Sequence, residues 1–158
     1  MAEEFDYKSS GEKSTSVVYT GEYIARPIGI KTPIQYGTAR SGLLQMNFEP
    51  AEQVHDNLKN LLLTNHGERV GLFRYGANLR SLVSERVSQE DFDDLAMQSI
   101  KSAIAAYMPF VEPMTFSSNI DSVDPTTGLT QVTVSLTYNV ISLSIRDKSI
   151  AVTIHCMG

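Results

Sequence analysis

Apolar residues recur at helical spacing in a stretch that opens at Glu49-Pro50 and continues as AEQVHDNLKNLLLT. Its apolar residues, Leu58 among them, fall at positions i, i+4, i+7 and i+8, which is one stripe of an amphipathic helix. Proline suits the first turn of a helix, and Asn65 to Gly67 supply a C-terminal stop. The pattern predicts a helix with Leu58 in the core, followed by a short helix from Ala77 to Val83.

A second helical pattern runs from about Gln89 to Tyr107, where apolar residues line one face. Ser88 is a good N-cap, and Asp91 three residues later completes a capping-box pattern. Pro109 ends the pattern because proline cannot donate a hydrogen bond to the preceding turn. We predict a long amphipathic helix over this range.

Beyond Pro109 the spacing of the apolar residues changes to two. Apolar and polar residues alternate from Val132 to Val140, which predicts a half-buried strand. A turn at Asp124 to Gly128 precedes this strand, so the segment from Val111 to Val123 is expected to be its antiparallel neighbour.

Past Val140 the alternation continues in the opposite phase as far as Ile145, which implies a bulge or a strand end near Val140. Arg146-Asp147-Lys148 is expected to form a turn. The segment from Ile150 to Ile154 is expected to form the last strand.

Helices followed by strands are typical of an α+β fold. We expect an N-terminal arm, two main helices plus a short one, and then an antiparallel sheet of three to four strands. Residues 1–32 are predicted to be the arm, partly disordered, and residues 33–158 a single domain. Glycines and prolines interrupt the apolar runs between Val17 and Tyr36. This part either wraps the surface of the domain or becomes ordered only on a partner.

Composition narrows the class of function. The chain has 158 residues, 42% of them hydrophobic, and a formal charge of −5 with its basic residues scattered, so we expect no nucleic-acid partner. No stretch approaches the ~20 apolar residues of a membrane span, and no secretory signal is expected at the amino terminus. The single cysteine, Cys156, has no partner for an internal disulfide.

The stretch from Gly67 to Leu82 reads GERVGLFRYGANLRSL, a Gly-Glu-Arg turn followed by the pair Tyr75-Gly76 and then Leu79. The order of helix, Gly-Glu-Arg turn, aromatic-Gly-x-x-Leu, second helix and strands resembles the small baseplate wedge protein of contractile-tailed phages. That family also includes the equivalent baseplate component of type VI secretion systems. The resemblance runs from roughly Pro33 to His155, and it implies a structural protein that is not an enzyme and needs no cofactor.

The motif has a physical rationale of its own. Two glycines are expected where the backbone turns tightly or takes positive φ, and an aromatic and a leucine are expected to point toward the first helix. These structural residues are Gly67, Gly76, Tyr75 and Leu79. In one interpretation the whole motif only ties the two helices together. Glu68 and Arg69, polar and in a turn, are expected to face a partner, although the fork of Arg69 also suits a turn carbonyl or a carboxylate.

The resemblance extends to the end of the long helix. There the family typically reads Tyr-Glu-Pro-Arg, a segment implicated in docking on the helical bundle of the wedge, and this chain has Tyr107-Met108-Pro109-Phe110. Either Met108 and Phe110 replace the charged contact by an apolar one, or both belong to the core of this chain. The candidate interface residues are Glu68, Arg69, Tyr107, Met108, Pro109 and Phe110.

The resemblance also implies a part in sheath assembly. The chain is nearly free of charge from Gly128 to Ile145, and an uncharged regular strand suits pairing with a strand of another chain. The alternative is that these strands pair only with each other. The expected partners are other baseplate wedge proteins and the tail sheath protein, with multiple copies in a sixfold baseplate. The expected location is the virion tail, assembled in the cytoplasm of a bacterial host.

Proteins of this family have been described as lysozyme-like, so a tail-associated peptidoglycan-cleaving enzyme is the alternative function. Such an enzyme needs two carboxylates in a cleft, one of them with a raised pKa. The candidates are Glu49, Glu52, Glu68, Glu85 and the Glu90–Asp94 cluster. The cluster lies at a helix N-terminus, which lowers the pKa of a carboxylate, and Arg69 has the same effect on Glu68. The chain also has no tryptophan.

Histidine and cysteine positions predict no metal site. His55, His66 and His155 are far apart in the sequence, and His155-Cys156 has no second pair to match it. We interpret the histidines as ordinary surface residues. A small intracellular adaptor without any connection to a tail is the third function considered.

Overall fold

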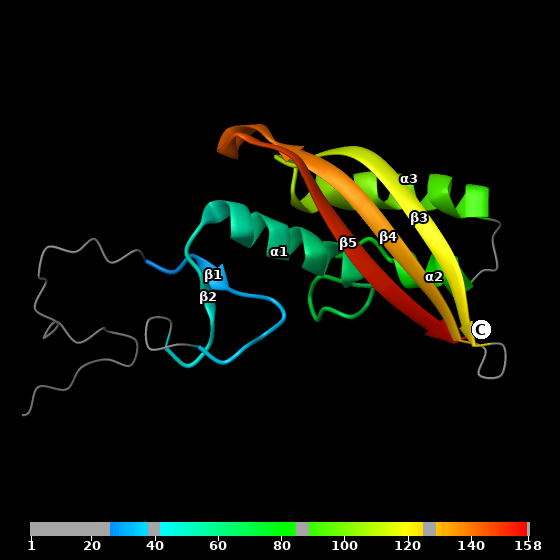
Figure 1. The fold of residues 1–158 in the computed structure, drawn as a ribbon, viewed down its shortest axis with the longest axis horizontal. Coiled ribbons are helices and arrows are strands. Elements are labelled where there is room, and N and C mark those ends of the chain that lie inside the picture. The colour runs from blue at the N-terminus through cyan, green and yellow to red at the C-terminus, as the bar shows by residue number, and fades with distance from the viewer. Residues whose placement is uncertain (1–25, 38–41, 85–88, 125–128, 158) are drawn as a thin grey trace, which may run out of the picture.

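The computed structural model describes residues 26–37, 42–84, 89–124 and 129–157 (Figure 1). Helices come first and the long strands last, which confirms the predicted α+β class. The elements are β1 (Gly29–Ile30), β2 (Met46–Asn47), α1 (Pro50–Leu63), α2 (Leu79–Ser84), α3 (Gln89–Tyr107), β3 (Glu112–Asp124), β4 (Leu129–Val140), the 3-10 helix η1 (Ile141–Leu143) and β5 (Ile145–Met157).

The two main helices have the predicted bounds. α1 begins with Pro50 in its first turn, and Leu58 on its inner side is fully buried. α3 runs from Gln89 to Tyr107, as predicted, and the expected cap Ser88 lies outside the described residues. The short helix α2 begins at Leu79, two residues later than expected, because Gly76 and Asn78 both have positive φ.

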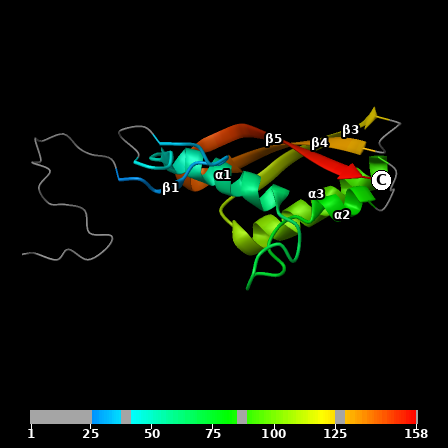
Figure 2. The same cartoon turned by 90° about the horizontal axis from the view of Figure 1, so that it is seen from below.

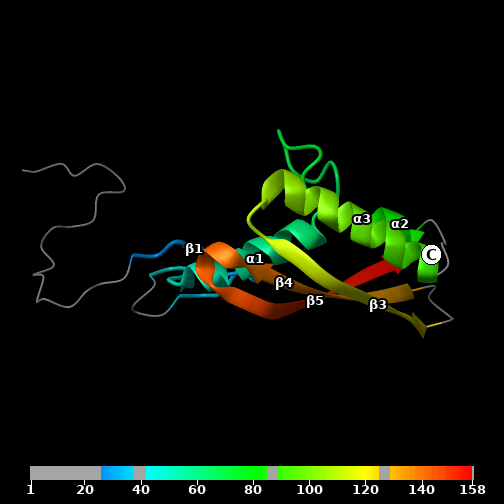
Figure 3. The ribbon, with the colours of Figure 1, turned by 90° about the horizontal axis from the view of Figure 1, so that it is seen from above.

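The long strands form one antiparallel sheet in the order β3-β4-β5, and β1 and β2 form a separate two-stranded ribbon. The three helices of the described residues lie on the same face of the large sheet, and no described helix or strand covers its other face, which is called the uncovered face below (Figures 2 and 3). α3 packs under β3, whereas α1 and α2 pack under β5. The predicted antiparallel pairing of the Val111–Val123 segment with the central strand is confirmed, and residues 125–128 of the predicted turn lie outside the described residues.

The reversal between the last two strands is not where the sequence placed it. β4 ends at Val140, as predicted, but the turn consists of η1 and Ser144, whose backbone is left-handed at φ 54°. The predicted turn at Arg146-Asp147-Lys148 is wrong, because these residues lie inside β5, where Lys148 pairs with Tyr138. Asp147 has a positive φ of 50° and its N–H donates to Asn139 Oδ1 at 2.7 Å, so turn-forming residues here make an irregularity within a strand.

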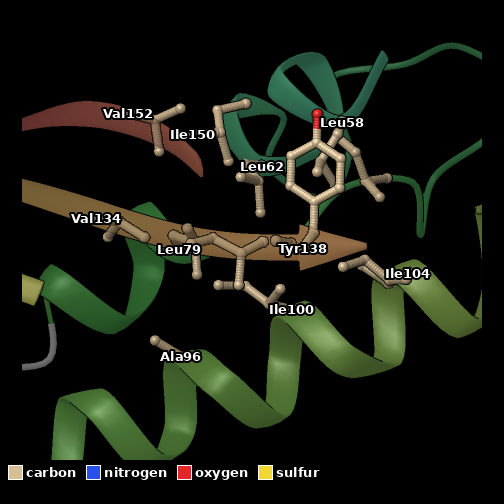
Figure 4. Close-up of a cluster of buried hydrophobic side chains, with 14 of the residues drawn as sticks. Leu58, Leu62, Leu79, Ala96, Ile100, Ile104, Val134, Tyr138, Ile150 and Val152 are labelled. Atoms are coloured by element: carbon tan, nitrogen blue, oxygen red, sulfur yellow. The ribbon is translucent and has the colours of Figure 1, made fainter. Parts of the chain in front are cut away.

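The core lies between the three helices and the inner face of the sheet (Figure 4). The alternation along β4 sends one face inward, and Tyr138 near its end points toward α1. The same period makes every second residue of β4 polar, so the uncovered face is built from Thr, Ser, Gln and Asn. The fully buried core residues include Leu58, Leu61, Leu79, Ala96, Ile100, Val132, Val134, Tyr138 and Val140.

A buried carboxylate holds the small ribbon onto α1. Asp56 Oδ2 accepts hydrogen bonds from the Thr32 N–H at 2.9 Å and from Asn47 Nδ2 at 2.7 Å. Asn47 on β2 is fully buried, and its amide also donates to Gln53 Oε1 at 3.2 Å. Sequence patterning did not reveal this network, since a polar helix residue is ordinarily exposed.

The predicted boundary between arm and domain, at residues 32 and 33, stays a prediction. Residues 1–25 lie outside the described residues, and Gly29–Ile30 form β1. Within the described ranges, none of the helices has both the length and the apolar character needed to cross a membrane.

Candidate functional site

The Gly-Glu-Arg segment forms an ordered loop between α1 and α2. Its ends are joined by the Gly67 N–H, which donates to the Phe73 carbonyl at 2.8 Å, and an inner turn is closed by the Leu72 N–H to the Arg69 carbonyl at 3.2 Å. Gly67 and Gly71 have φ of +87° and +82°, a conformation that glycine adopts without steric cost. The positive φ predicted at Gly67 is confirmed.

The second half of the motif packs directly on the end of α1. Gly76 has φ +110°, and a Cβ at this position would lie 2.0 Å from the carbonyl oxygen of Thr64. Next to it the Ala77 N–H donates to the Leu61 carbonyl at 3.0 Å, and Ser99 Oγ on α3 donates to the Ala77 carbonyl at 2.6 Å. This part of the motif therefore ties α1 to α3, and Leu79 behind it is fully buried.

Three side chains form a stack that joins the two sequence segments singled out as candidate interfaces. The Arg69 guanidinium lies 3.8 Å from the centroid of the Tyr75 ring, and the Tyr75 ring is 4.9 Å from that of Tyr107 at the end of α3. Such a cation–π contact and a tilted ring pair are both favourable arrangements. The fold thus brings the Glu68-Arg69 turn and the Tyr107–Phe110 segment to one side of the molecule. Arg69 therefore contacts an aromatic ring in this structure. The sequence had suggested a turn carbonyl or a carboxylate as its partner instead.

The Tyr107–Phe110 segment divides its side chains between core and surface. Met108 is 5% exposed and belongs to the hydrophobic core, whereas Phe110 is 46% exposed and Pro109 is exposed. The sequence left open whether Met108 and Phe110 both form an apolar contact with a partner or both belong to the core. The structure divides them: Met108 belongs to the core, and Phe110 lies at the surface. Phe110 is therefore a large apolar side chain that a partner can reach, with the exposed Pro109 beside it.

Glu68 is exposed, and its carboxylate binds Asn65, which lies just beyond the end of α1. Its Oε2 accepts the Asn65 backbone N–H at 2.9 Å, and its Oε1 accepts the Asn65 side-chain amide at 2.8 Å. These hydrogen bonds hold the pKa of Glu68 below its ordinary value. A general acid of a glycosidase requires a raised pKa, so the electrostatics of this carboxylate oppose that role.

Sequence reasoning missed one polar pair, which joins α1 to the sheet. His55 on α1 is half-buried and its Nδ1 lies 3.0 Å from the Tyr138 hydroxyl, so its interpretation as a surface histidine is wrong. Burial lowers the pKa of His55, with Lys148 and Lys59 adding to the effect and Asp56 opposing it. Burial also raises the pKa of Tyr138 to about 12. A residue on the polar side of a helix gave no sign of a partner 83 positions away in the sequence.

The remaining candidate ligands do not gather. His66 and His155 are exposed, and the described residues contain no cluster of three or more His, Cys, Asp or Glu side chains able to hold a metal ion. In the acidic cluster at the start of α3, Asp91 and Asp94 are exposed, while Asp93 accepts a hydrogen bond from the Ser118 hydroxyl on β3.

The C-terminal sheet has two edge strands whose outer backbone groups are available for pairing. The charge-poor strand β4 is central, so the outer strands are β3 and β5, each thirteen residues long. In the described chain no further strand pairs with either of them. An unpaired edge presents backbone donors and acceptors to another strand.

Comparisons with known proteins agree with this architecture. A sequence model of the family described as baseplate wedge protein gp25 matches residues 49–143. No curated protein matches the chain. The cryo-EM structure of the anti-feeding prophage baseplate, sixfold symmetrised, contains a chain that is similar in fold, with a TM-score of 0.50 and 13% identity over 81% of this chain and 82% of that chain. A crystal structure from Geobacter sulfurreducens, provisionally named a tail lysozyme, matches with a TM-score of 0.45 and 19% identity over 71% of this chain and 95% of that one.

Proposed function

This chain belongs to the family of the baseplate wedge protein gp25, and on that premise we propose that it is a structural component of the baseplate wedge of a contractile phage tail. Members of such an assembly act through surfaces that they offer to neighbours. The proposal therefore assigns a role to each of two surfaces, one on the helical side and one at the sheet.

The helical side docks on the helical bundle of the wedge. Support comes from the Arg69–Tyr75–Tyr107 stack, which sets the Glu68-Arg69 turn and the exposed Phe110 on one side. Phe110 contributes apolar area where the family typically has a charge, and large apolar side chains are favoured at interface centres. Met108 supports this surface from the core beneath it.

The sheet receives the tail sheath and nucleates its assembly. The observation that carries this part is the pair of long outer strands, β3 and β5, with which no further strand of the described residues pairs. A strand of another chain that pairs with one of these edges gains main-chain hydrogen bonds without needing a particular side-chain sequence. Partners are then the other wedge proteins and the sheath protein, with several copies of this chain in a sixfold baseplate built in the cytoplasm of a bacterial host.

Co-expression with the other baseplate proteins of the same tail tests the structural role. The tagged chain should purify together with them, and a chain that purifies alone under these conditions would overturn the proposal. Sheath nucleation is then followed by electron microscopy after the sheath protein is added.

Paired lysines test each edge separately, since lysine on an edge strand discourages strand addition. Ala151→Lys with Thr153→Lys places the charges on β5, and Thr115→Lys with Ser117→Lys is the matched change on β3. All four side chains are exposed, so both variants should fold. One of them should join the baseplate but fail to start sheath polymerisation; normal polymerisation with both would rule out strand addition at this sheet.

A further inference from the structure

The loop between α1 and α2 exposes three apolar side chains in sequence. Val70 is 105% exposed, Phe73 72% and Leu72 50%, and we call these three residues the apolar loop tip. Scattered apolar residues are ordinary on protein surfaces, but apolar residues grouped on one projecting element mark an interaction site. The three fall within four consecutive positions of the fifteen-residue loop 64–78, which is such a grouping.

The loop that carries the tip is held in shape by its own polar groups. The Gly67 N–H to Phe73 carbonyl bond closes it, Glu68 binds Asn65, and the Tyr75 N–H donates to the Leu72 carbonyl at 2.9 Å. The Phe73 ring lies over Gly67, where a Cβ would be 3.3 Å from a ring carbon. A loop that is already ordered loses little conformational freedom when it binds, so its apolar groups contribute more of their burial to affinity.

Charge around the tip is opposite in sign to that of the whole chain. From residue 64 to residue 80 there are three arginines, Arg69, Arg74 and Arg80, against the single acidic residue Glu68, whereas the full chain has a formal charge of −5. Glu68 keeps its negative charge, because its hydrogen bonds to Asn65 favour the carboxylate form, and the three arginines still leave this segment with a formal net charge of +2. Arg74 and Arg69 flank the tip on both sides and are exposed.

The loop projects away from the sheet. Figures 2 and 3 show the segment between α1 and α2 extending beyond the helices, on the side opposite to the uncovered face of the sheet. A partner seated on the tip therefore leaves both edges of the sheet accessible.

We propose that the apolar loop tip is a docking knob that inserts into an apolar pocket bordered by carboxylates on another protein of the baseplate. This inference rests on the proposed function and adds to it a partner chemistry and an interface role for three residues that are absent from the candidate interface given above. Val70 and Phe73 fill the pocket, and Arg69 and Arg74 face its acidic border. Apolar burial provides the affinity, and the arginines set the orientation and the rate of association.

Co-expression with the other wedge proteins of the same tail tests the proposal with two loop variants, Phe73→Ser and Arg74→Glu. The matched control is Ile141→Ser in η1, since Ile141 is 71% exposed and so loses a similarly exposed apolar side chain. Phe73→Ser should melt like the unaltered chain and should bind the partner about tenfold more weakly or worse, as expected for a central interface aromatic. Arg74→Glu should bind more weakly too, and it should lose most of the sensitivity to salt that the unaltered chain shows.

A benzophenone amino acid in place of Val70 then identifies what the tip touches in the purified assembly. A cross-link to an apolar segment of a baseplate protein that contains aspartate or glutamate is the expected result. A cross-link to nucleic acid, to a second copy of this chain or to nothing overturns the inference. Unchanged binding by Phe73→Ser overturns the inference alone, whereas a failure of both the unaltered chain and Ile141→Ser to co-purify overturns the proposed function together with it.

Discussion

Replacing Gly76 by alanine tests how closely the motif packs on α1. The added Cβ would lie 2.0 Å from the Thr64 carbonyl oxygen and 2.7 Å from its carbonyl carbon. Both neighbours are backbone atoms, so the two segments must move apart by about 1 Å or more before the contact becomes tolerable. The residue also keeps a φ of +110°, which is strained for any residue with a side chain.

The cost follows from the strain and from the hydrogen bonds that the movement breaks. A residue with a Cβ in the left-handed region costs ~1–2 kcal/mol. The bonds from the Ala77 N–H to the Leu61 carbonyl, 3.0 Å, and from the Asn78 N–H to the Thr64 carbonyl, 3.3 Å, are both at risk. Each contributes ~0.5–1.5 kcal/mol, so Gly76→Ala should lower the free energy of unfolding by about 2–5 kcal/mol. That is a large part of the ~5–15 kcal/mol that stabilises a typical domain.

Gly71→Ala is the matched control. Gly71 has φ +82°, and a Cβ there would meet no atom within 4 Å, so this variant bears the conformational strain without the collision. The two variants should differ by about 1–3 kcal/mol in urea denaturation, and by ~2–4 °C in Tm for each kcal/mol. Equal losses in the two variants would show that the approach of Gly76 to Thr64 does not matter for stability.

Three further predictions concern the core, the histidine and the docking segment. Leu58→Ala should cost ~2–5 kcal/mol in urea denaturation because Leu58 is fully buried, and a loss below 1 kcal/mol would contradict its place in the core. Burial lowers the pKa of His55 below its ordinary 6.5, so the unfolded chain takes up the proton first. The contribution of His55 to the free energy of unfolding should therefore be constant above pH 6.5 and should fall as the pH drops below 6.5. His55→Gln should remove this part of the pH dependence. Identical pH profiles for His55→Gln and the unaltered chain would refute the prediction. Met108→Ser should lower Tm sharply, whereas Phe110→Ser should leave Tm nearly unchanged and weaken co-purification with the wedge proteins. A sharp loss of Tm in Phe110→Ser and none in Met108→Ser would contradict the assignment of Met108 to the core and Phe110 to the interface.

Much of the fold follows from periodicity in the sequence. The 3.6-residue spacing of apolar groups predicts α1 and α3 with their observed bounds, and the two-residue spacing predicts β4 with its inward face. Proline and glycine mark the helix ends because their backbone restrictions act locally. Gly67 and Gly76 could be assigned positive φ for the same reason.

Local sequence signals were misleading where the same residues suit both a turn and an irregular strand. Arg146-Asp147-Lys148 has the composition of a turn, yet pairing with β4 keeps these residues in β5 and leaves only Asp147 with a positive φ. The actual reversal, through η1 and Ser144, has an apolar composition that gives little turn signal. Long-range strand pairing decided between the two positions.

The contacts of the candidate site depend on residues that are distant in the sequence and were settled only by tertiary structure. Tyr75 and Tyr107 meet because α1, the loop and α3 pack together, and the same packing buries Met108 while it leaves Phe110 exposed. His55 pairs with Tyr138 across 83 positions, and Asp56 is buried only because the β1–β2 ribbon covers it. The sequence by itself thus determined the main helices, the central strand with its inward face, and the family, since these depend on local spacing and motif. Which polar side chains find partners, and which apolar ones stay in water, depends on how the elements meet in space.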